Sequence, residues 1–101
     1  MTGRVAIVGG GITGLATAYF LQERARASRQ PLEIFLIEGE HRLGGKVLTE
    51  RARGFIVEGG PDSFLTQKPW ALQLCEGLGL GESLTGPQPR RKTYVLLKGR
   101  L

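Results

Sequence analysis

The sequence predicts an α/β fold that begins with a parallel βαβ unit over residues 4–38. Two largely apolar runs supply its strands, Val5–Val8 and Leu32–Ile37, as expected for strands buried on both faces of a sheet. Between them, a glycine turn is followed by apolar residues at helical spacing: Ile12, Leu15, Ala16, Tyr19 and Phe20. Strand, glycine turn, helix and second strand in this order predict a Rossmann-like unit.

The glycine turn has the G-x-G-x-x-G spacing that binds the pyrophosphate of a dinucleotide. Gly9 permits a tight turn, Gly11 lets a pyrophosphate approach the backbone, and Gly14 lets the helix pack close to the strand. The helix directs its unpaired N–H groups towards the phosphates. The alternative is an ordinary βα turn without a ligand, since 16 of the 101 residues are glycine. The expected pyrophosphate contacts are Gly9, Gly10, Gly11, Ile12, Thr13 and Gly14.

An acid at the end of the second predicted strand fits the ribose of the same ligand. The carboxylate of Glu38 can accept hydrogen bonds from both adenosine ribose hydroxyls, and it would repel the 2′-phosphate of NADP. Glu38 follows Gly14 by 24 residues, slightly more than the usual spacing of about 20, because a polar extension over residues 23–31 precedes the strand. Alone, Glu38 would be interpreted as a solvated strand-end acid. Behind this turn it is predicted to bind ribose, with Gly39 beside it.

Composition indicates a globular protein without a membrane span. The net charge is +5, and basic residues gather at Arg24–Arg29 and Arg90–Lys92. Nucleic acid, an acidic membrane surface and an anionic substrate are alternatives for these clusters, but solvated surface is the favoured interpretation. Aromatic residues do not alternate with the cations as in single-strand binders, so no nucleic-acid partner is expected. Cys75 is the only cysteine, and no metal site is predicted.

The sequence after Glu38 predicts a loop and hairpin over residues 39–60 and a helix-and-strand region over residues 61–101. Val47–Glu50 and Phe55–Glu58 are expected to pair across a turn at residues 53–54. Lys68–Pro69 should open a helix with an apolar stripe, and Lys92–Leu97 should form a strand followed by a turn. A half-built hairpin at the end and only two parallel strands favour a chain truncated from a longer protein.

A second glycine motif follows Glu38 and has basic flanks. Its two glycines bring bare backbone near the pyrophosphate, and its members are Arg42, Gly44, Gly45 and Lys46. The alternative is a flexible charged turn. With the first motif and Glu38, it resembles the amine-oxidase-like flavoproteins, two-domain proteins that bind FAD. In that group an Arg usually follows the glycine pair; Lys46 keeps the charge but lacks the bidentate fork.

Three segments together resemble the oxygen-dependent, FAD-containing protoporphyrinogen oxidases: Val8–Ala16, Arg42–Lys46 and Glu58–Leu65. The lysine variant and the third segment are similar to the bacterial branch acting on coproporphyrinogen III. The resemblance spans essentially all 101 residues of this chain. Members of the family are several times longer. It implies an N-terminal FAD-binding segment of a two-domain flavoprotein without its substrate domain. It also implies cofactor contacts from Lys46 and from Gly60, Pro61, Asp62 and Ser63.

The resemblance implies that FAD oxidises a porphyrinogen in three two-electron steps of haem biosynthesis, with oxygen as the final acceptor and peroxide as its product. No residue stands out as a catalytic acid or base, and His41 is interpreted as a solvent-facing loop residue. Asp62 and Ser63 could equally cap a turn or helix. Another FAD amine-oxidase-like enzyme and an inactive nucleotide-binding fragment remain alternatives. A cytoplasmic location is expected, peripheral membrane association and oligomeric state are open, and the fragment alone should not oxidise porphyrinogens.

Overall fold

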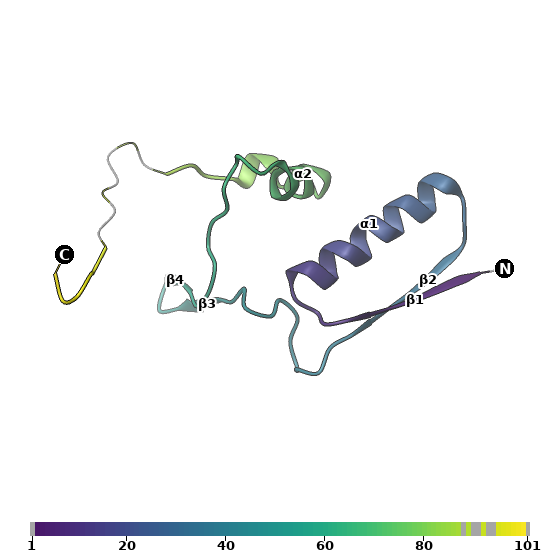
Figure 1. Cartoon of the computed structure of the whole chain (residues 1–101), viewed down its shortest axis with the longest axis horizontal. Coiled ribbons are helices and arrows are strands. Elements are labelled where there is room, and N and C mark those ends of the chain that lie inside the picture. The colour runs from purple at the N-terminus through teal and green to yellow at the C-terminus, as the bar shows by residue number, and fades with distance from the viewer. Residues whose placement is uncertain (1, 88, 90–91, 93–94, 101) are drawn as a thin grey trace. The chain divides into compact units, whose positions relative to one another are not determined.

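The computed structural model describes residues 2–87, 89, 92 and 95–100. It divides the chain into two compact units, residues 1–65 and 66–101. Figure 1 shows the elements in chain order. The first unit holds a βαβ unit and a hairpin, and the second holds a helix and a short 3-10 turn.

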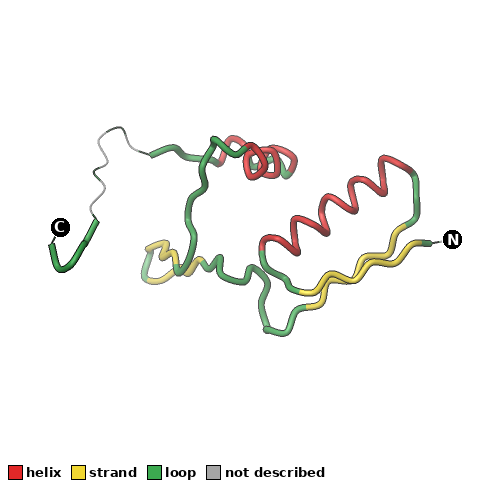
Figure 2. The backbone as a smooth tube through the Cα atoms, viewed as in Figure 1, coloured by secondary structure: helices red, strands yellow, loops and turns green. Residues whose placement is uncertain are grey.

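The predicted βαβ unit is confirmed. Strand β1 (Gly3–Val8) pairs in parallel with strand β2 (Leu32–Ile37), with Val5 opposite Ile34 and Val8 opposite Ile37. Helix α1 (Ile12–Ser28) connects them and lies along the strand pair (Figure 2). The helix continues through most of the polar extension expected before β2, so the long spacing to Glu38 is absorbed by additional helical turns. Arg29 ends the helix with a φ of 53°, in the left-handed region.

The strand pair is covered on one face only in this chain, which corrects the expectation of strands buried on both faces. Side chains facing α1, such as Ile7 and Ile34, are half-buried. The alternate side chains are exposed, with Val8 at 85% and Phe35 at 52%. No described hydrophobic side chain is fully buried. The apolar composition on both faces is nevertheless typical of strands covered on both sides.

The predicted hairpin is also confirmed. Strand β3 (Thr49–Ala52) pairs antiparallel with strand β4 (Phe55–Glu58), two residues later than the expected start of the first strand. The turn residues Arg53 and Gly54 have φ values of 50° and 82°. Two consecutive positive φ angles characterise the type I′ turn, whose twist matches that of the flanking strands.

The second unit contains the helix expected at Lys68–Pro69. Helix α2 (Pro69–Gly77) has Pro69 in its first turn, and the chain leaves it through Gly79, whose φ is 72°. A 3-10 helix η1 (Gly81–Ser83), which was not predicted, follows. The apolar stripe of α2 is only partly covered: Trp70 and Leu78 are 68% and 49% exposed, whereas Leu74 is half-buried.

The strand expected over residues 92–97 is not present among its described residues. Lys92, Val95 and Leu96 have no strand pairing, while residues 93–94 lie outside the described part. Leu97 forms only an isolated antiparallel bridge with Arg100, across the expected turn. The physical reason is that a strand needs a neighbouring strand to pair its backbone groups, and no described segment supplies one here.

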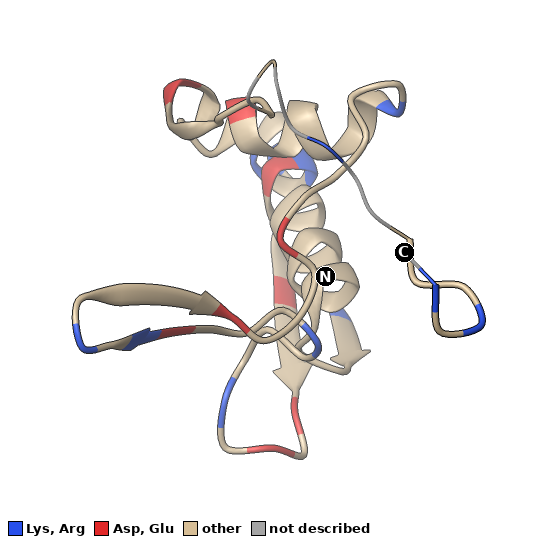
Figure 3. Cartoon of the chain, turned by 90° about the vertical axis from the view of Figure 1, so that its left-hand side faces the viewer, with Lys and Arg blue, Asp and Glu red and all other residues tan. Residues whose placement is uncertain are grey.

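Charges of both signs are distributed along the described chain (Figure 3). Arg90 and Arg91 of the predicted basic cluster lie outside the described residues. Within the part that the structure describes, no helix is both long and apolar enough to span a bilayer.

Candidate functional site

The first glycine turn has the geometry that its spacing predicts. Gly9 has a φ of 106°, and its N–H donates to the Ile37 carbonyl at 2.7 Å, which ties the turn to the end of β2. A Cβ on Gly14 would overlap the Gly9 carbonyl oxygen, so the helix and the turn approach as closely as only glycine permits. Gly11 is the N-cap of α1 and provides no side-chain cap. The first N–H groups of the helix are therefore directed at the turn without a capping oxygen.

The Glu38 carboxylate lies against this turn. Its Oε2 accepts a 2.6 Å hydrogen bond from the Gly10 N–H, and its Oε1 accepts one of 2.9 Å from the Glu40 N–H. These bonds, led by that from Glu40, lower the pKa of Glu38 below its ordinary value of 4.5; the Gly39 backbone and Arg42 act in the same direction against the opposing effect of burial. The carboxylate is therefore ionised near neutral pH. It retains lone pairs beyond the two these N–H groups use.

The second glycine pair lies directly on the first turn. The Gly44 N–H donates to the Gly10 carbonyl at 2.8 Å, and Gly44 forms a parallel bridge with Gly11. Gly44 and Gly45 have φ values of 108° and 57°, and a Cβ on Gly45 would lie 3.2 Å from the Gly11 Cα. Both glycines are thus required by backbone conformation and by close contact, since a Cβ on Gly44 would lie 2.9 Å from the Val47 carbonyl oxygen. The two motifs, more than thirty residues apart in sequence, form one surface of bare backbone.

Most of the predicted site residues line a cavity of about 550 Å³ at the N-terminal end of α1, within the range of ligand pockets. The predicted residues in its lining are Gly9, Gly11, Ile12, Thr13, Gly14, Gly44, Gly45, Lys46 and Pro61. Gly10 and Glu38 are not in the lining but adjoin it through the bonds above. The structure therefore brings together both glycine motifs, the basic Lys46 and the first part of the third segment.

Only part of the third segment, residues 58–65, lies at the cavity. A Cβ on Gly60 would overlap the Lys46 carbonyl oxygen, so Gly60 is required for chain packing next to the cavity. Pro61 lines the cavity, whereas Asp62 and Ser63 do not. The Ser63 hydroxyl donates to Oδ1 of Asp62 at 3.1 Å, and the N-cap of α2 is Lys68. Neither residue caps α2, and their contact with a cofactor remains a prediction.

Four residues that line the cavity were not predicted from the sequence: Ile7, Val8, Thr17 and Val47. Thr17 lies one helical turn after Thr13 and donates to its carbonyl at 2.7 Å, so helical spacing could have indicated it. Val47 directly follows Lys46, and Ile7 and Val8 directly precede the glycine turn. His41 is exposed, in accord with the expectation of a solvent-facing loop residue.

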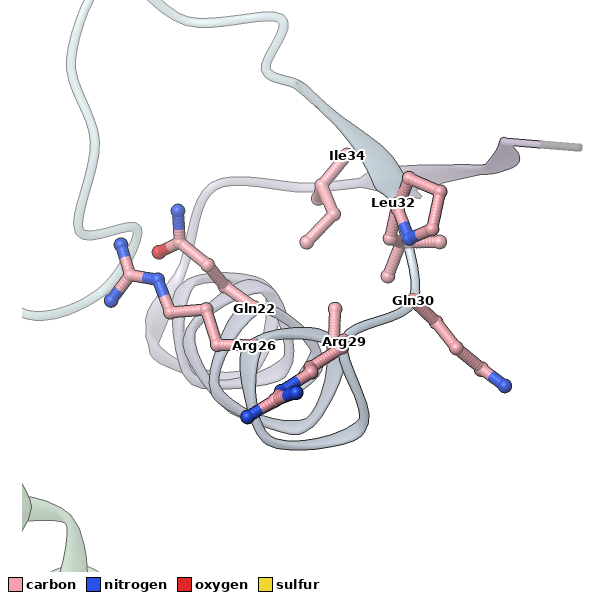
Figure 4. Close-up of a pocket in the computed structure, with 8 residues that line it drawn as sticks. Gln22, Arg26, Arg29, Gln30, Leu32 and Ile34 are labelled. Atoms are coloured by element: carbon pink, nitrogen blue, oxygen red, sulfur yellow. The ribbon is translucent and has the colours of Figure 1, made fainter.

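A second cavity, of about 530 Å³, lies at the opposite end of α1 (Figure 4). Its labelled residues come from the last turns of the helix, the turn that follows, and β2: Gln22, Arg26, Arg29, Gln30, Leu32 and Ile34. Arg26 bonds to Glu23 on its own helix at 2.9 Å. None of the predicted site residues lies here, so the glycine-lined cavity is the candidate site.

Comparison with known proteins agrees with this geometry. The family model of flavin containing amine oxidoreductases matches residues 12–101. The chain is 44% identical over 97 residues to coproporphyrinogen III oxidase of Bacillus subtilis, covering 96% of this chain and 20% of that protein. It is 33% identical over 96 residues to protoporphyrinogen oxidase 2 of Arabidopsis thaliana, covering 95% of this chain and 18% of that protein. The chain thus spans about a fifth of the length of these relatives.

A solved structure shows the same likeness in three dimensions. It is a crystal structure from Exiguobacterium sp. 255-15, assigned provisionally as a protoporphyrinogen oxidase. The match has a TM-score of 0.68 and 51% identity, and covers 79% of this chain and 17% of that one. Together with the family match over residues 12–101, it establishes that the chain belongs to the flavin containing amine oxidoreductase family.

Proposed function

We propose that this chain is the FAD-binding part of an enzyme that oxidises a porphyrinogen, coproporphyrinogen III or protoporphyrinogen IX, to the porphyrin with oxygen as acceptor in haem biosynthesis. The observation that carries the proposal is that two glycine motifs far apart in sequence meet at one cavity, with Glu38 bonded to Gly10 beside it. A dinucleotide needs bare backbone for its pyrophosphate and a carboxylate for its ribose, and the two must lie side by side.

The residues present fit FAD. The Gly9–Gly14 turn and the Gly44–Gly45 pair leave backbone without Cβ atoms, which permits close approach of a pyrophosphate. Glu38 is ionised and retains acceptor capacity for ribose hydroxyls. Lys46 places a positive charge in the cavity lining. The predicted contacts of Gly39, Asp62 and Ser63 with the cofactor belong to this proposal, as does a role for Arg42 in the FAD site.

The substrate class rests on the relatives. Proteins named coproporphyrinogen III oxidase from Bacillus subtilis and Propionibacterium freudenreichii are each 44% identical to this chain, and the plant protein named protoporphyrinogen oxidase 2 is 33% identical. The higher identity to the bacterial proteins favours coproporphyrinogen III. When bound, FAD supplies the acceptor for the electron pairs that a porphyrinogen loses. The residues of this chain bind and orient that cofactor. We place the enzyme in the cytoplasm, with peripheral membrane association as a further prediction.

A chimera tests the proposal. The matching N-terminal segment of the Bacillus subtilis coproporphyrinogen III oxidase, to which this chain aligns over 97 residues, is replaced by this chain. FAD content is read from the flavin absorbance of the purified protein, and porphyrin formation from the fluorescence of the oxidised product. We expect stoichiometric FAD and coproporphyrin formation that needs oxygen.

A folded chimera without FAD would contradict the proposal at the level of the cofactor. Bound FAD without porphyrin formation, beside an active unaltered relative, would show that this chain does not hold FAD as porphyrinogen oxidation requires, and would contradict the proposal at the level of the activity. Because the host supplies the rest of the enzyme, the result reports on what this chain contributes.

A further inference from the structure

The Arg42 guanidinium is bonded to its own loop. Its Nη2 donates to the Gly45 carbonyl at 2.5 Å, and its Nη1 lies 3.3 Å from the carbonyl oxygens of both Leu43 and Val47. One side chain thus contacts three carbonyl groups within six consecutive residues. A guanidinium has five N–H donors in a fixed plane and is suited to holding several acceptors at once.

The carbonyls that Arg42 contacts belong to the glycine-pair loop. Gly44 and Gly45 both have positive φ angles, and glycine loses more conformational freedom on ordering than any other residue. The loop is tied at one side by the bond from the Gly44 N–H to the Gly10 carbonyl and is closed by the bond from the Val47 N–H to the Gly44 carbonyl. Arg42 adds side-chain bonds to the carbonyls of Leu43, Gly45 and Val47, which these two backbone bonds do not use.

Lys46 lies inside this braced segment. It stands between Gly45 and Val47, whose carbonyls Arg42 contacts, and it lines the cavity whereas Arg42 does not. The two cations of the motif therefore occupy different positions: one at the cavity and one on the loop that presents it. A direct contact between Arg42 and a phosphate would require the guanidinium to give up its carbonyl partners.

We propose that Arg42 is a positioning residue that holds the loop over residues 42–47 in the shape that presents Gly44, Gly45 and Lys46 to the FAD pyrophosphate. This deepens the proposed function and rests on it. The role depends on the shape of the guanidinium rather than on its charge, because one ammonium group cannot match a planar fork of donors. Arg42→Lys should then behave like Arg42→Gln, and neither should alter the salt dependence of FAD binding.

The test uses this chain with Arg42→Lys and Arg42→Gln, and with Arg51→Lys and Arg51→Gln in β3 as matched controls. Amide hydrogen exchange of Gly44 and Val47 is measured without ligand, with circular dichroism as the check of folding. We expect exchange of both amides to accelerate about tenfold in the two Arg42 variants and in neither control. Unchanged exchange in a folded Arg42→Gln variant would overturn the proposal.

FAD binding distinguishes positioning from direct contact. We expect Kd to rise about tenfold for both Arg42 variants, with an unchanged slope of log Kd against log salt concentration. Millimolar ethylguanidinium should partly restore binding to Arg42→Ala. Wild-type affinity in Arg42→Lys, or a reduced salt slope, would instead identify a charge contact and overturn the positioning role. Failure of the unaltered chain to bind FAD would count against the proposed function, while the exchange result would still decide whether Arg42 holds the loop.

Discussion

The backbone N–H of Gly10 donates a 2.6 Å hydrogen bond to the carboxylate of Glu38, 28 residues later in the chain. The bond joins the glycine turn after β1 to the residue that follows β2. A Cβ on Gly10 would lie 2.9 Å from Oε2 of Glu38, closer than such contacts occur. The acid predicted to bind ribose therefore also holds the turn predicted to bind pyrophosphate, which couples two parts of the site.

Glu38→Gln should weaken FAD binding while the fold persists. The amide keeps the shape of the side chain but loses the charge that strengthens its bonds to Gly10, Glu40 and the ribose hydroxyls. A loss of about 1.5–3 kcal/mol is expected, or roughly a 10- to 100-fold rise in Kd. Calorimetric titration with FAD measures it, with Glu50→Gln in β3 as the charge-matched control. Equal affinities in the two variants would exclude Glu38 from the site.

Acid should destabilise the first unit through Glu38. The pKa of Glu38 is lowered in the folded chain, chiefly by the hydrogen bonds from Glu40 and Gly10, so the unfolded state binds more protons in acid. Its contribution to the free energy of unfolding is present above the ordinary value of 4.5 and is lost as the pH falls through the lower folded pKa. Chemical denaturation between pH 7 and pH 3 should show a steeper acid decline in the wild type than in Glu38→Gln. Parallel curves would contradict this.

Gly14→Ala should destabilise the chain even though alanine is the better helix former. Alanine gains up to about 1 kcal/mol in helix propensity. Its Cβ would overlap the Gly9 carbonyl oxygen, and overpacking costs about 1–3 kcal/mol. A net loss in the free energy of unfolding is expected by chemical denaturation. Gly86→Ala is the control, because a Cβ there meets no atom within 4 Å. If Gly14→Ala were as stable as this control, the helix and the turn would not approach too closely for a Cβ, contrary to this account.

Lys46→Arg and Lys46→Gln should separate charge from shape at the cavity. Lys46 lines the cavity, and the proposed function puts its charge near the FAD phosphates. Lys46→Gln should weaken FAD binding several-fold and reduce its salt dependence, whereas Lys46→Arg should keep both near the wild-type values. Titrations at low and high salt measure the two slopes. An unchanged salt slope in Lys46→Gln would place the lysine away from the phosphates.

The sequence predicted the elements whose signals are local. The strands around the glycine turn, the turn at residues 53–54 and Pro69 at the start of α2 follow from apolar runs, glycine positions and the fixed φ of proline. The pairing of Gly11 with Gly44 could be expected only through the resemblance, because it joins segments far apart in sequence. Glycine spacing could not indicate the carbonyl partners of Arg42, which depend on the shape of its loop.

The segment over residues 92–97 shows where local signals fail. Its apolar and β-branched composition favours a strand, but strand formation depends on a partner that composition does not reveal. The same limit applies to the strand pair of the first unit, because apolar alternate positions such as Val8 and Phe35 indicate a covering layer without identifying it.

The most direct test of the account is a titration of the folded chain with FAD, ADP and riboflavin, followed by flavin fluorescence and calorimetry. If the glycine motifs and Glu38 form one site for pyrophosphate and ribose, FAD binds at one equivalent, ADP competes with it, and riboflavin, which has neither group, does not. A folded chain that binds no FAD, or that binds riboflavin as tightly as FAD, would contradict the account.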